Sequence, residues 1–310
     1  MAISFTGTLL PMIGNRLIHG VTGQALLTCF KLFGSGVILA TGFVHMLIPS
    51  TIALTDKCLP QSFQSYSALS GVFAIVGILL THLIQTYAGK FIKDSQSVVK
   101  GSEVKHLHAS DLASTSDDVS QQTLDNVELQ PVVLHHEGHT HSHGLPSNLV
   151  DPNKRLLVYM LELGIASHSI MVGVALGIAT DEFISLLIAL SFHQFFEGIA
   201  LSAVVIEARF EKMIMNHLMV VLYTLTTPIG IVIGIGIHQS FSMDATGSLI
   251  SQGVIDAVSA GILIYDSLVN VIVPHFTSPY FQTSSAAFQA TQFTVFYFGV
   301  GIMALIGCWA

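Results

Sequence analysis

Long apolar runs separated by short polar segments dominate this chain. Seven of these runs are long enough to cross a hydrocarbon core of about 30 Å, which takes about 20 helical residues. They cover residues 28–48, 66–88, 155–178, 182–206, 215–238, 248–273 and 288–309. An eighth run, Ile3 to Gly14, is too short to span, and we interpret it as part of a short or truncated first span. The pattern predicts an all-α membrane protein with eight transmembrane helices.

One polar segment, residues 90–154, interrupts the series and divides the chain into three parts. Residues 1–89 hold the first three spans, and residues 155–310 hold the other five. The segment itself is rich in Ser, Asp, Gln and Lys, a composition typical of disordered loops. Near its end it carries five histidines, namely His135, His136, His139, His141 and His143. We predict an accessory metal-binding loop that selects no particular metal, with a merely polar linker as the alternative.

The charged residues indicate that the chain lies in a membrane and how it is oriented there. Only 10% of the 310 residues are charged and 51% are hydrophobic, whereas a soluble domain carries about 25% charged residues. With eight spans, the connections that follow spans 1, 3, 5 and 7 share one side and hold ten of the 11 Lys and Arg residues. The opposite side holds only Lys57. Basic loops stay in the cytosol, so we expect a cytoplasmic loop 90–154 and two non-cytoplasmic termini. No basic surface for nucleic acid is visible.

The candidate chemistry lies in a tight hairpin formed by the runs 155–178 and 182–206. His168 lies 13 residues before Asp181, at the centre of the turn, and His193 lies 12 after it. Both imidazoles are therefore expected at the same depth, roughly 18–20 Å from the turn. Glu197 follows His193 at i+4 and shares its helical face.

Inserting an acidic side chain at mid-bilayer costs at least about 2.5 kcal/mol, so an interaction that offsets this cost is expected. A polar cluster that joins two helices is one explanation. Two imidazoles and a carboxylate with an open fourth position also form a ligand set that zinc accepts. The sequence therefore predicts a site for a divalent transition metal ion that is carried through the membrane.

Small residues in these spans predict close helix contacts. Gly173 and Gly177, Gly198 and Ser202, and Gly230 and Gly234 follow the small-xxx-small pattern. We expect the first two pairs to support a tightly packed hairpin between the two spans that carry the histidines.

At these residues the chain resembles the ZIP (Zrt-, Irt-like protein) family of metal transporters, and within it the plant, fungal and protist branch. The resemblance rests on Gly-Val-Ile-Leu-Ala-Thr-Gly-Phe-Val-His at 36–45, on Leu-Glu-Leu-Gly with His-Ser at 161–169, and on Ser-Phe-His-Gln-Phe-Phe-Glu-Gly at 191–198. It implies a ZIP-like bundle of eight helices, alternating access and, in many members, homodimers.

Carried over residue by residue, the resemblance assigns roles inside the bilayer. His168, His193 and Glu197 match the principal metal site, and Ser169 and Gln194 match the lining of a neighbouring second site. On the transport path, the resemblance assigns His45 to the outer half and matches Asp256 to an acid common in the seventh span. From its position near the cytosolic mouth, Glu162 has an exit role or makes a packing hydrogen bond.

Two departures from the family pattern bear on the mechanism. Some relatives carry a metal-bridging glutamate where this chain has Val172, so we expect one tightly held ion. Many relatives have an acid where this chain has Asn270, and we expect Asp266, one turn earlier, to take its place on the path.

The expected function is uptake of zinc into the cytosol, with the ion as substrate and no prosthetic group. Iron(II) or manganese transport within the same family, and a cation-diffusion-facilitator exporter, remain alternatives. An enzyme is not expected, because the chain lacks the H-E-x-x-H motif of an intramembrane metalloprotease. A seven-span receptor would not explain ligands at matched depth. We expect the plasma membrane rather than an organelle, with the lipid bilayer and a divalent ion as partners.

Overall fold

The computed structural model describes residues 1–17, 20–87, 90, 152–179, 183–210, 212–237 and 246–308. The predicted loop between residues 91 and 151 lies outside the described residues. So do its five histidines, which are His135, His136, His139, His141 and His143. Everything below concerns the helical unit that the described residues form.

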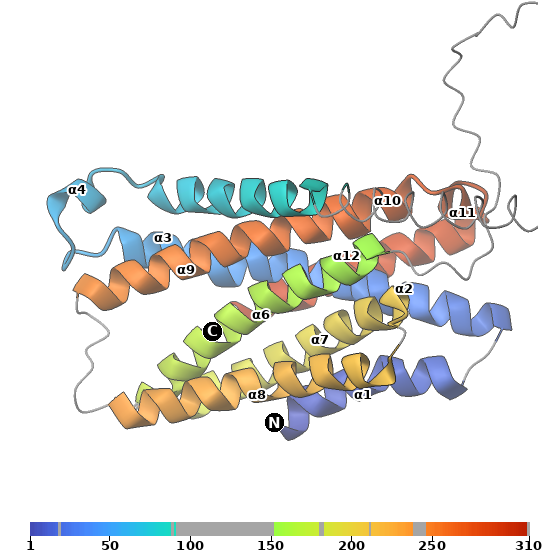
Figure 1. Cartoon of the computed structure of the whole chain (residues 1–310), viewed down its shortest axis with the longest axis horizontal. Helices are drawn as coiled ribbons and strands as arrows, with labels where there is room; N and C mark the ends of the chain where they lie inside the picture. Colours follow the sequence, from blue (N-terminus) through green and yellow to red (C-terminus); the bar gives the residue numbers. More distant parts are fainter. Residues whose placement is uncertain are drawn as a thin grey trace, which may run out of the picture. The chain divides into compact units, whose positions relative to one another are not determined.

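The described part of the chain is helical throughout and contains no strand (Figure 1). In chain order its helices are α1 (Ala2–Leu17), α2 (Gly20–Ala40), η1 (Thr41–Leu47), α3 (Ile48–Leu54), α4 (Gln61–Gln64), a helix over Leu69–Tyr87, α6 (Pro152–Ile178), α7 (Phe183–Ala208), α8 (Met213–Ile237), α9 (Thr246–Tyr265), η2 (Asp266–Ile272), α10 (Val273–Phe276), α11 (Pro279–Gln282) and α12 (Ala286–Ile306). Within the described residues, seven helical stretches are long and apolar enough to cross a membrane, and α1 is a shorter apolar helix. The predicted all-α membrane fold is confirmed.

Two of the spans are much longer than their apolar runs. The run 28–48 belongs to a continuous helix of 33 residues, Thr22–Leu54, and the run 248–273 to one of 31 residues, Thr246–Phe276. Such helices measure roughly 45–50 Å, which exceeds the hydrocarbon core and requires tilting or protruding ends. Hydropathy located these helices but not the residues by which they continue beyond the apolar runs.

A π-helical segment followed by proline interrupts each long helix. The segment η1 precedes Pro49, and η2 precedes Pro274. Proline has no N–H, so it cannot bond the carbonyl four residues earlier, and that residue is His45 in one helix and Asn270 in the other. Wide π turns often mark functional positions, and here each lies in the C-terminal half of its long helix.

The helices form two neighbouring sets that meet at the site described below. In one set, α6 packs on α8 and α1 packs on α7. In the other, α12 packs on α2, while α3 and η1 pack on α9. Contacts of α2 with α7, and of α6 with α9 and with α7, bring the sets together.

Glycines let α6 and α8 approach at backbone distance. A Cβ added to Gly173 would lie 2.5 Å from the Thr227 carbonyl oxygen and 3.0 Å from Gly230 Cα, and Gly177 meets Gly234 in the same way. Gly198 instead faces α1 and Tyr223. The predicted close contacts exist, but the expectation that small residues join the two histidine-bearing spans to each other is wrong. Gly173 and Gly177 of α6 contact α8 and Gly198 of α7 contacts α1, because α6 and α7 present their polar faces to one another.

Candidate metal centre

Four helical elements bring the candidate ligands together. His168 comes from α6, His193 and Glu197 from α7, His45 from η1 and Asp256 from α9. All five side chains are buried, with exposed fractions of 2% for His168 and His193 and 0% for Glu197. The i, i+4 spacing on α7 puts His193 and Glu197 on one face, as expected.

Distances show that the three predicted ligands and His45 form one cluster. His193 Nε2 lies 2.8 Å from Glu197 Oε1. The rings of His168 and His193 are stacked with centroids 5.4 Å apart, so the two imidazoles are direct neighbours. The His45 ring is closer still to His193, at 4.9 Å between centroids. The resemblance predicted His45 on the outer half of the transport path, and in the structure its ring lies against that of His193.

Many of the polar atoms in this cluster have no hydrogen-bond partner. Both ring nitrogens of His168, Nε2 of His193 and both carboxylate oxygens of Glu197 are buried and unpaired. The 2.8 Å contact between His193 and Glu197 is short but lacks hydrogen-bond geometry. A buried polar atom without a partner costs about 1–3 kcal/mol, more when it is charged. Unpaired nitrogen and oxygen atoms of this kind could coordinate a metal ion, which would supply the missing interactions.

The cluster is not a closed coordination shell. Among the described residues, no group of three or more His, Cys, Asp or Glu side chains is already arranged to hold a metal ion. Zinc requires nitrogen and oxygen ligands at about 2.0–2.2 Å. An ion held by these residues would therefore need their side chains to rotate inward.

Ser169 and Gln194 lie directly behind the cluster and face each other. Gln194 Nε2 donates to Ser169 Oγ at 3.1 Å, and its amide oxygen is buried and unpaired. From α8, the Tyr223 hydroxyl donates to the backbone carbonyl of Gln194 on α7. Sequence reasoning missed Tyr223, although a phenol within an apolar span needs a hydrogen-bond partner and so signals a buried contact.

Two other contacts fix the outer edge of the cluster. His45 Nε2 lies 2.8 Å from the Met303 carbonyl oxygen of α12, which fixes the orientation of its ring. Asp256 Oδ1 lies 3.8 Å from His168 Nδ1. Asp256 thus lies directly beside His168.

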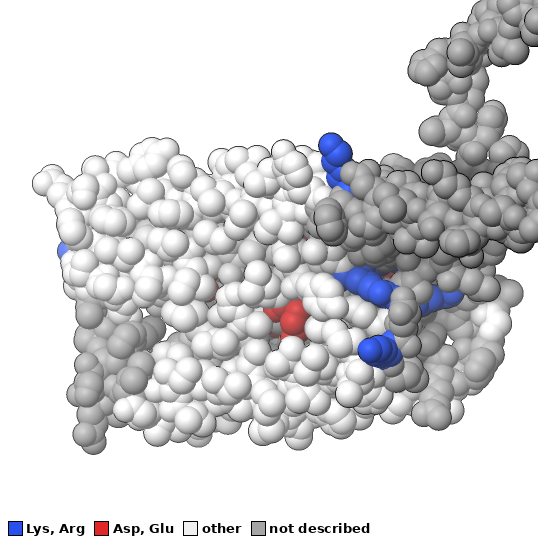
Figure 2. Space-filling view, in the orientation of Figure 1, with Lys and Arg blue, Asp and Glu red and all other residues white. Residues whose placement is uncertain are grey.

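A cavity of about 170 Å³ borders the cluster on one side. Its lining includes His45, His168, His193 and Asp256. Pro49, Leu186 and Gly307 line it as well, and all three lie in the helix halves nearer to Lys57. We call this side the lysine-poor end of the bundle and the opposite side, with Lys31 and Lys154, the lysine-rich end. Figure 2 shows the described basic side chains gathered at one end, with another at the far edge.

The remaining predicted path residues lie outside the cluster. Glu162 is 7% exposed, has two unpaired carboxylate oxygens and lies on α6 between His168 and the lysine-rich end. Asp266 is fully buried, and its Oδ1 accepts hydrogen bonds from Gln85 and Asn270, both 2.8 Å long. It is thus tied to the helix Leu69–Tyr87 and to its neighbour in η2.

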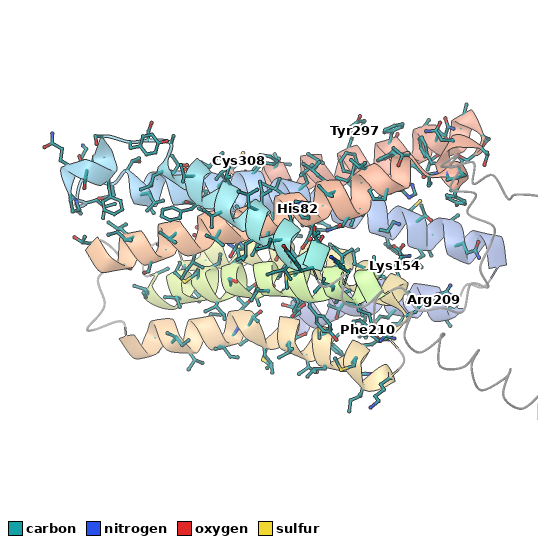
Figure 3. The ribbon with its side chains drawn as sticks, turned by 45° about the horizontal axis from the view of Figure 1, so that its top comes forward. His82, Lys154, Arg209, Phe210, Tyr297 and Cys308 are labelled. Atoms are coloured by element: carbon teal, nitrogen blue, oxygen red, sulfur yellow. The ribbon has the colours of Figure 1, made fainter. Side chains whose placement is uncertain are left out.

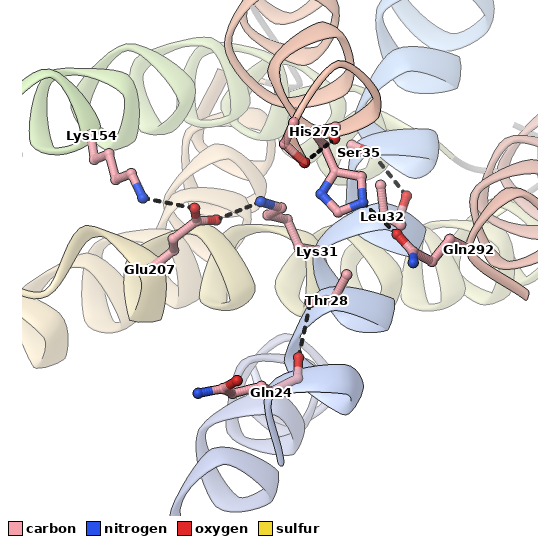
Figure 4. A network of polar contacts seen from close by, with 10 residues as sticks. Gln24, Thr28, Lys31, Leu32, Ser35, Lys154, Glu207, His275 and Gln292 are labelled. Carbon is pink, nitrogen blue, oxygen red and sulfur yellow. Dashed lines mark hydrogen bonds and ion pairs between the residues drawn. The ribbon is translucent and has the colours of Figure 1, made fainter. Parts of the chain in front are cut away.

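A pair of salt bridges at the lysine-rich end was not predicted from the sequence. Glu207 Oε2 lies 3.0 Å from Lys31 Nζ, and Glu207 Oε1 lies 2.9 Å from Lys154 Nζ (Figure 4). The three residues connect α2, α6 and α7. Lys154, Arg209 and Phe210 lie close to this end in the side-chain view (Figure 3). No sequence rule pairs residues so far apart along the chain.

Comparison with known proteins agrees with the all-α membrane architecture. The family model described as "ZIP Zinc transporter" matches residues 1–307. Zinc transporter 9 of Arabidopsis thaliana is 33% identical, with 100% of this chain and 97% of the relative covered. Zinc transporter 3 of Oryza sativa subsp. japonica is 31% identical over 100% of this chain and 86% of the relative. Fe(2+) transport protein 3, chloroplastic, of Arabidopsis thaliana is 31% identical over 98% and 82%, respectively.

The match extends over nearly the whole chain, and the seven helices long and apolar enough to cross a membrane agree with it. This multi-pass membrane protein is not an enzyme, and its substrates are divalent metal ions. The chain belongs to the ZIP zinc transporter family.

Proposed function

We propose that this protein moves zinc into the cytosol by alternating access at a site formed by His168, His193 and Glu197. The observation that carries the proposal is the group of buried, unpaired nitrogen and oxygen atoms where the two helix sets meet. Ser169 and Gln194 complete the lining as a neighbouring polar wall. One ion is expected, since Val172 supplies no bridging carboxylate.

The side to which this conformation opens follows from an asymmetry between the two ends. The cavity beside the site extends toward the lysine-poor end. Toward the lysine-rich end, the site is covered by the largest apolar core, which includes Leu161, Ile165, Leu201, Val204 and Leu263. Basic residues favour the cytosolic side, so this conformation faces outward and is closed toward the cytosol. Beyond this core, the Glu207 ion pairs join three helices and border a separate cavity of about 410 Å³, which does not include the candidate ligands in its lining.

The path we propose follows from these positions. The ion approaches along the cavity past His45 and Asp256, is held at the site, and leaves past Glu162 after the core separates. Asp266 supports the inner half of the path through its bonds to Gln85 and Asn270. A negative-inside potential favours inward movement of two charges by about 4.6 kcal/mol per 100 mV, which is sufficient without ATP.

Thiol labelling tests this outward conformation. In a background in which Cys29, Cys58 and Cys308 are serine, Val172→Cys lines the cavity and is expected to react with a membrane-impermeant thiol reagent added outside. Ile165→Cys, with no exposed surface, is the matched control on the same helix and is expected to react at least about tenfold more slowly. Equal labelling of both positions would contradict the sealed inner half.

Metal choice needs its own experiment, because two imidazoles and a carboxylate also accept iron(II) and manganese. Radioactive zinc uptake into zinc-starved cells is expected, with the tagged protein at the plasma membrane. Zinc should compete better than iron(II) or manganese, because its preference for few nitrogen and oxygen ligands fits this set. Stronger competition by iron would make this an iron transporter, in line with the name of one relative.

A further inference from the structure

Asp256 lies beside the metal site with an unusual environment for a carboxylate. It is 4% exposed, on the face of α9 that packs on α6. Its Oδ1 atom is buried and makes no hydrogen bond. The neighbouring Nδ1 atom of His168, 3.8 Å away, is also buried and unpaired.

The orientation of the His168 ring shows which of its nitrogens faces Asp256. Its ring is stacked on the His193 ring with 29° between planes, so both of its nitrogens lie in a plane beside His193. Because Nδ1 is on the side of Asp256, Nε2 is the nitrogen left to meet an ion. A neutral imidazole carries one proton, and a hydrogen bond at one nitrogen decides that the other offers its lone pair.

We propose that Asp256 is a positioning residue that acts through His168. Asp256 Oδ1 accepts the Nδ1–H of His168, which fixes the tautomer and turns Nε2 toward the ion. This inference rests on the proposed function of His168 as a metal ligand. The present 3.8 Å is about 0.8 Å longer than a typical N–H···O bond, and the inward rotation that coordination requires would close the gap. No proton is transferred, since the hydrogen stays on Nδ1.

Two other roles for Asp256 make different predictions. A direct ligand would bind the ion independently of His168. A purely structural acid would affect folding and leave the affinity of the folded protein unchanged. Metal-bound histidines commonly donate their second N–H to a carboxylate, and removing such a partner typically lowers metal affinity about 10- to 100-fold.

The experiment is a double-mutant cycle on the full chain purified in detergent, with zinc affinity measured by competition with a chelator. Asp256→Ala is expected to weaken binding about 10- to 100-fold. Asp256→Asn should lose less, because its amide oxygen still accepts the bond. In the His168→Ala background, Asp256→Ala should cause no further loss. Ser248→Ala, a buried change on the same helix, should leave affinity unchanged.

Each other outcome has a distinct meaning. Equal losses from Asp256→Ala in both backgrounds would make Asp256 a direct ligand and overturn the proposal. Unchanged affinity in a folded Asp256→Ala variant would overturn it as well. If His168→Ala itself leaves affinity unchanged, the proposed metal site fails, whichever way Asp256 behaves.

A spectroscopic measurement covers the case in which the alanine variant does not fold. Nitrogen-15 chemical shifts of labelled histidine distinguish the two tautomers, and the Nδ1–H form of His168 should dominate in the parent. Its share should fall in Asp256→Leu, which keeps the branched shape of the side chain and has no atom that accepts the Nδ1–H. An unchanged share would contradict the proposal even if the protein is folded.

Discussion

Glu197→Gln is expected to reduce zinc uptake to background in cells that carry normal amounts of the protein at their surface. The substitution keeps the volume of a fully buried side chain and removes only its charge. The carboxylate is the one anionic group in the predicted ligand set, and it lies 2.8 Å from His193 Nε2. Removing a hydrogen-bond partner of a metal ligand typically lowers metal affinity about 10- to 100-fold. Removing the charge of the ligand itself should lower the affinity further. Radioactive uptake, normalised to surface protein, measures the effect.

The same experiment needs a partner variant and a control. His193→Gln should be as severe as Glu197→Gln, since it removes the ligand shared by the contacts with His45, His168 and Glu197. His217→Gln changes a histidine near the start of α8, away from the cluster, and should keep uptake near the parent level. Full zinc uptake by Glu197→Gln would exclude this carboxylate as a ligand and require another site.

Gly234→Leu should prevent the α6 and α8 helices from packing and thereby abolish correctly folded protein. A Cβ at this position would lie 2.5 Å from the Val174 carbonyl oxygen and 3.0 Å from Gly177 Cα. Both obstacles are backbone, which cannot move aside as a flexible side chain would. We expect a cost of at least about 3 kcal/mol, the upper end of ordinary overpacking. Fluorescence-detected size-exclusion chromatography and thermal unfolding measure the loss.

The chain offers a close control two residues away. At Gly236 an added Cβ meets nothing within 4 Å, so Gly236→Leu should give a normal elution profile and an unfolding temperature close to that of the parent. If both leucine variants behave alike, glycine at the crossing is not what sets the α6–α8 distance.

The membrane architecture was largely readable from the sequence. Apolar runs located all seven spanning helices in the described residues, because lipid requires about 20 consecutive apolar residues whatever their neighbours are. Their exact ends were not readable. Thr22–Leu54 continues beyond its run at both ends, since mixed polar and apolar residues there lower the mean hydropathy without preventing helix formation.

Part of the site was also readable. Counting residues from the turn predicted that His168 and His193 lie at the same level of their two helices, which agrees with the contact of their rings, because an α-helix rises by a constant amount per residue. The i+4 spacing likewise predicted the shared face of His193 and Glu197. Both relations are local to one hairpin, which is why one sequence suffices for them.

Tertiary structure decided the relations between helices that are distant in the chain. Only packing brings His45 to His193, puts Asp256 beside His168, and turns Asp266 toward Gln85 instead of toward the cluster. It also joins Glu207 to Lys31 and Lys154. Hydropathy and helical periodicity specify depth and face within one helix. They do not specify which face meets which neighbour, because that choice depends on the fit of all the helices at once.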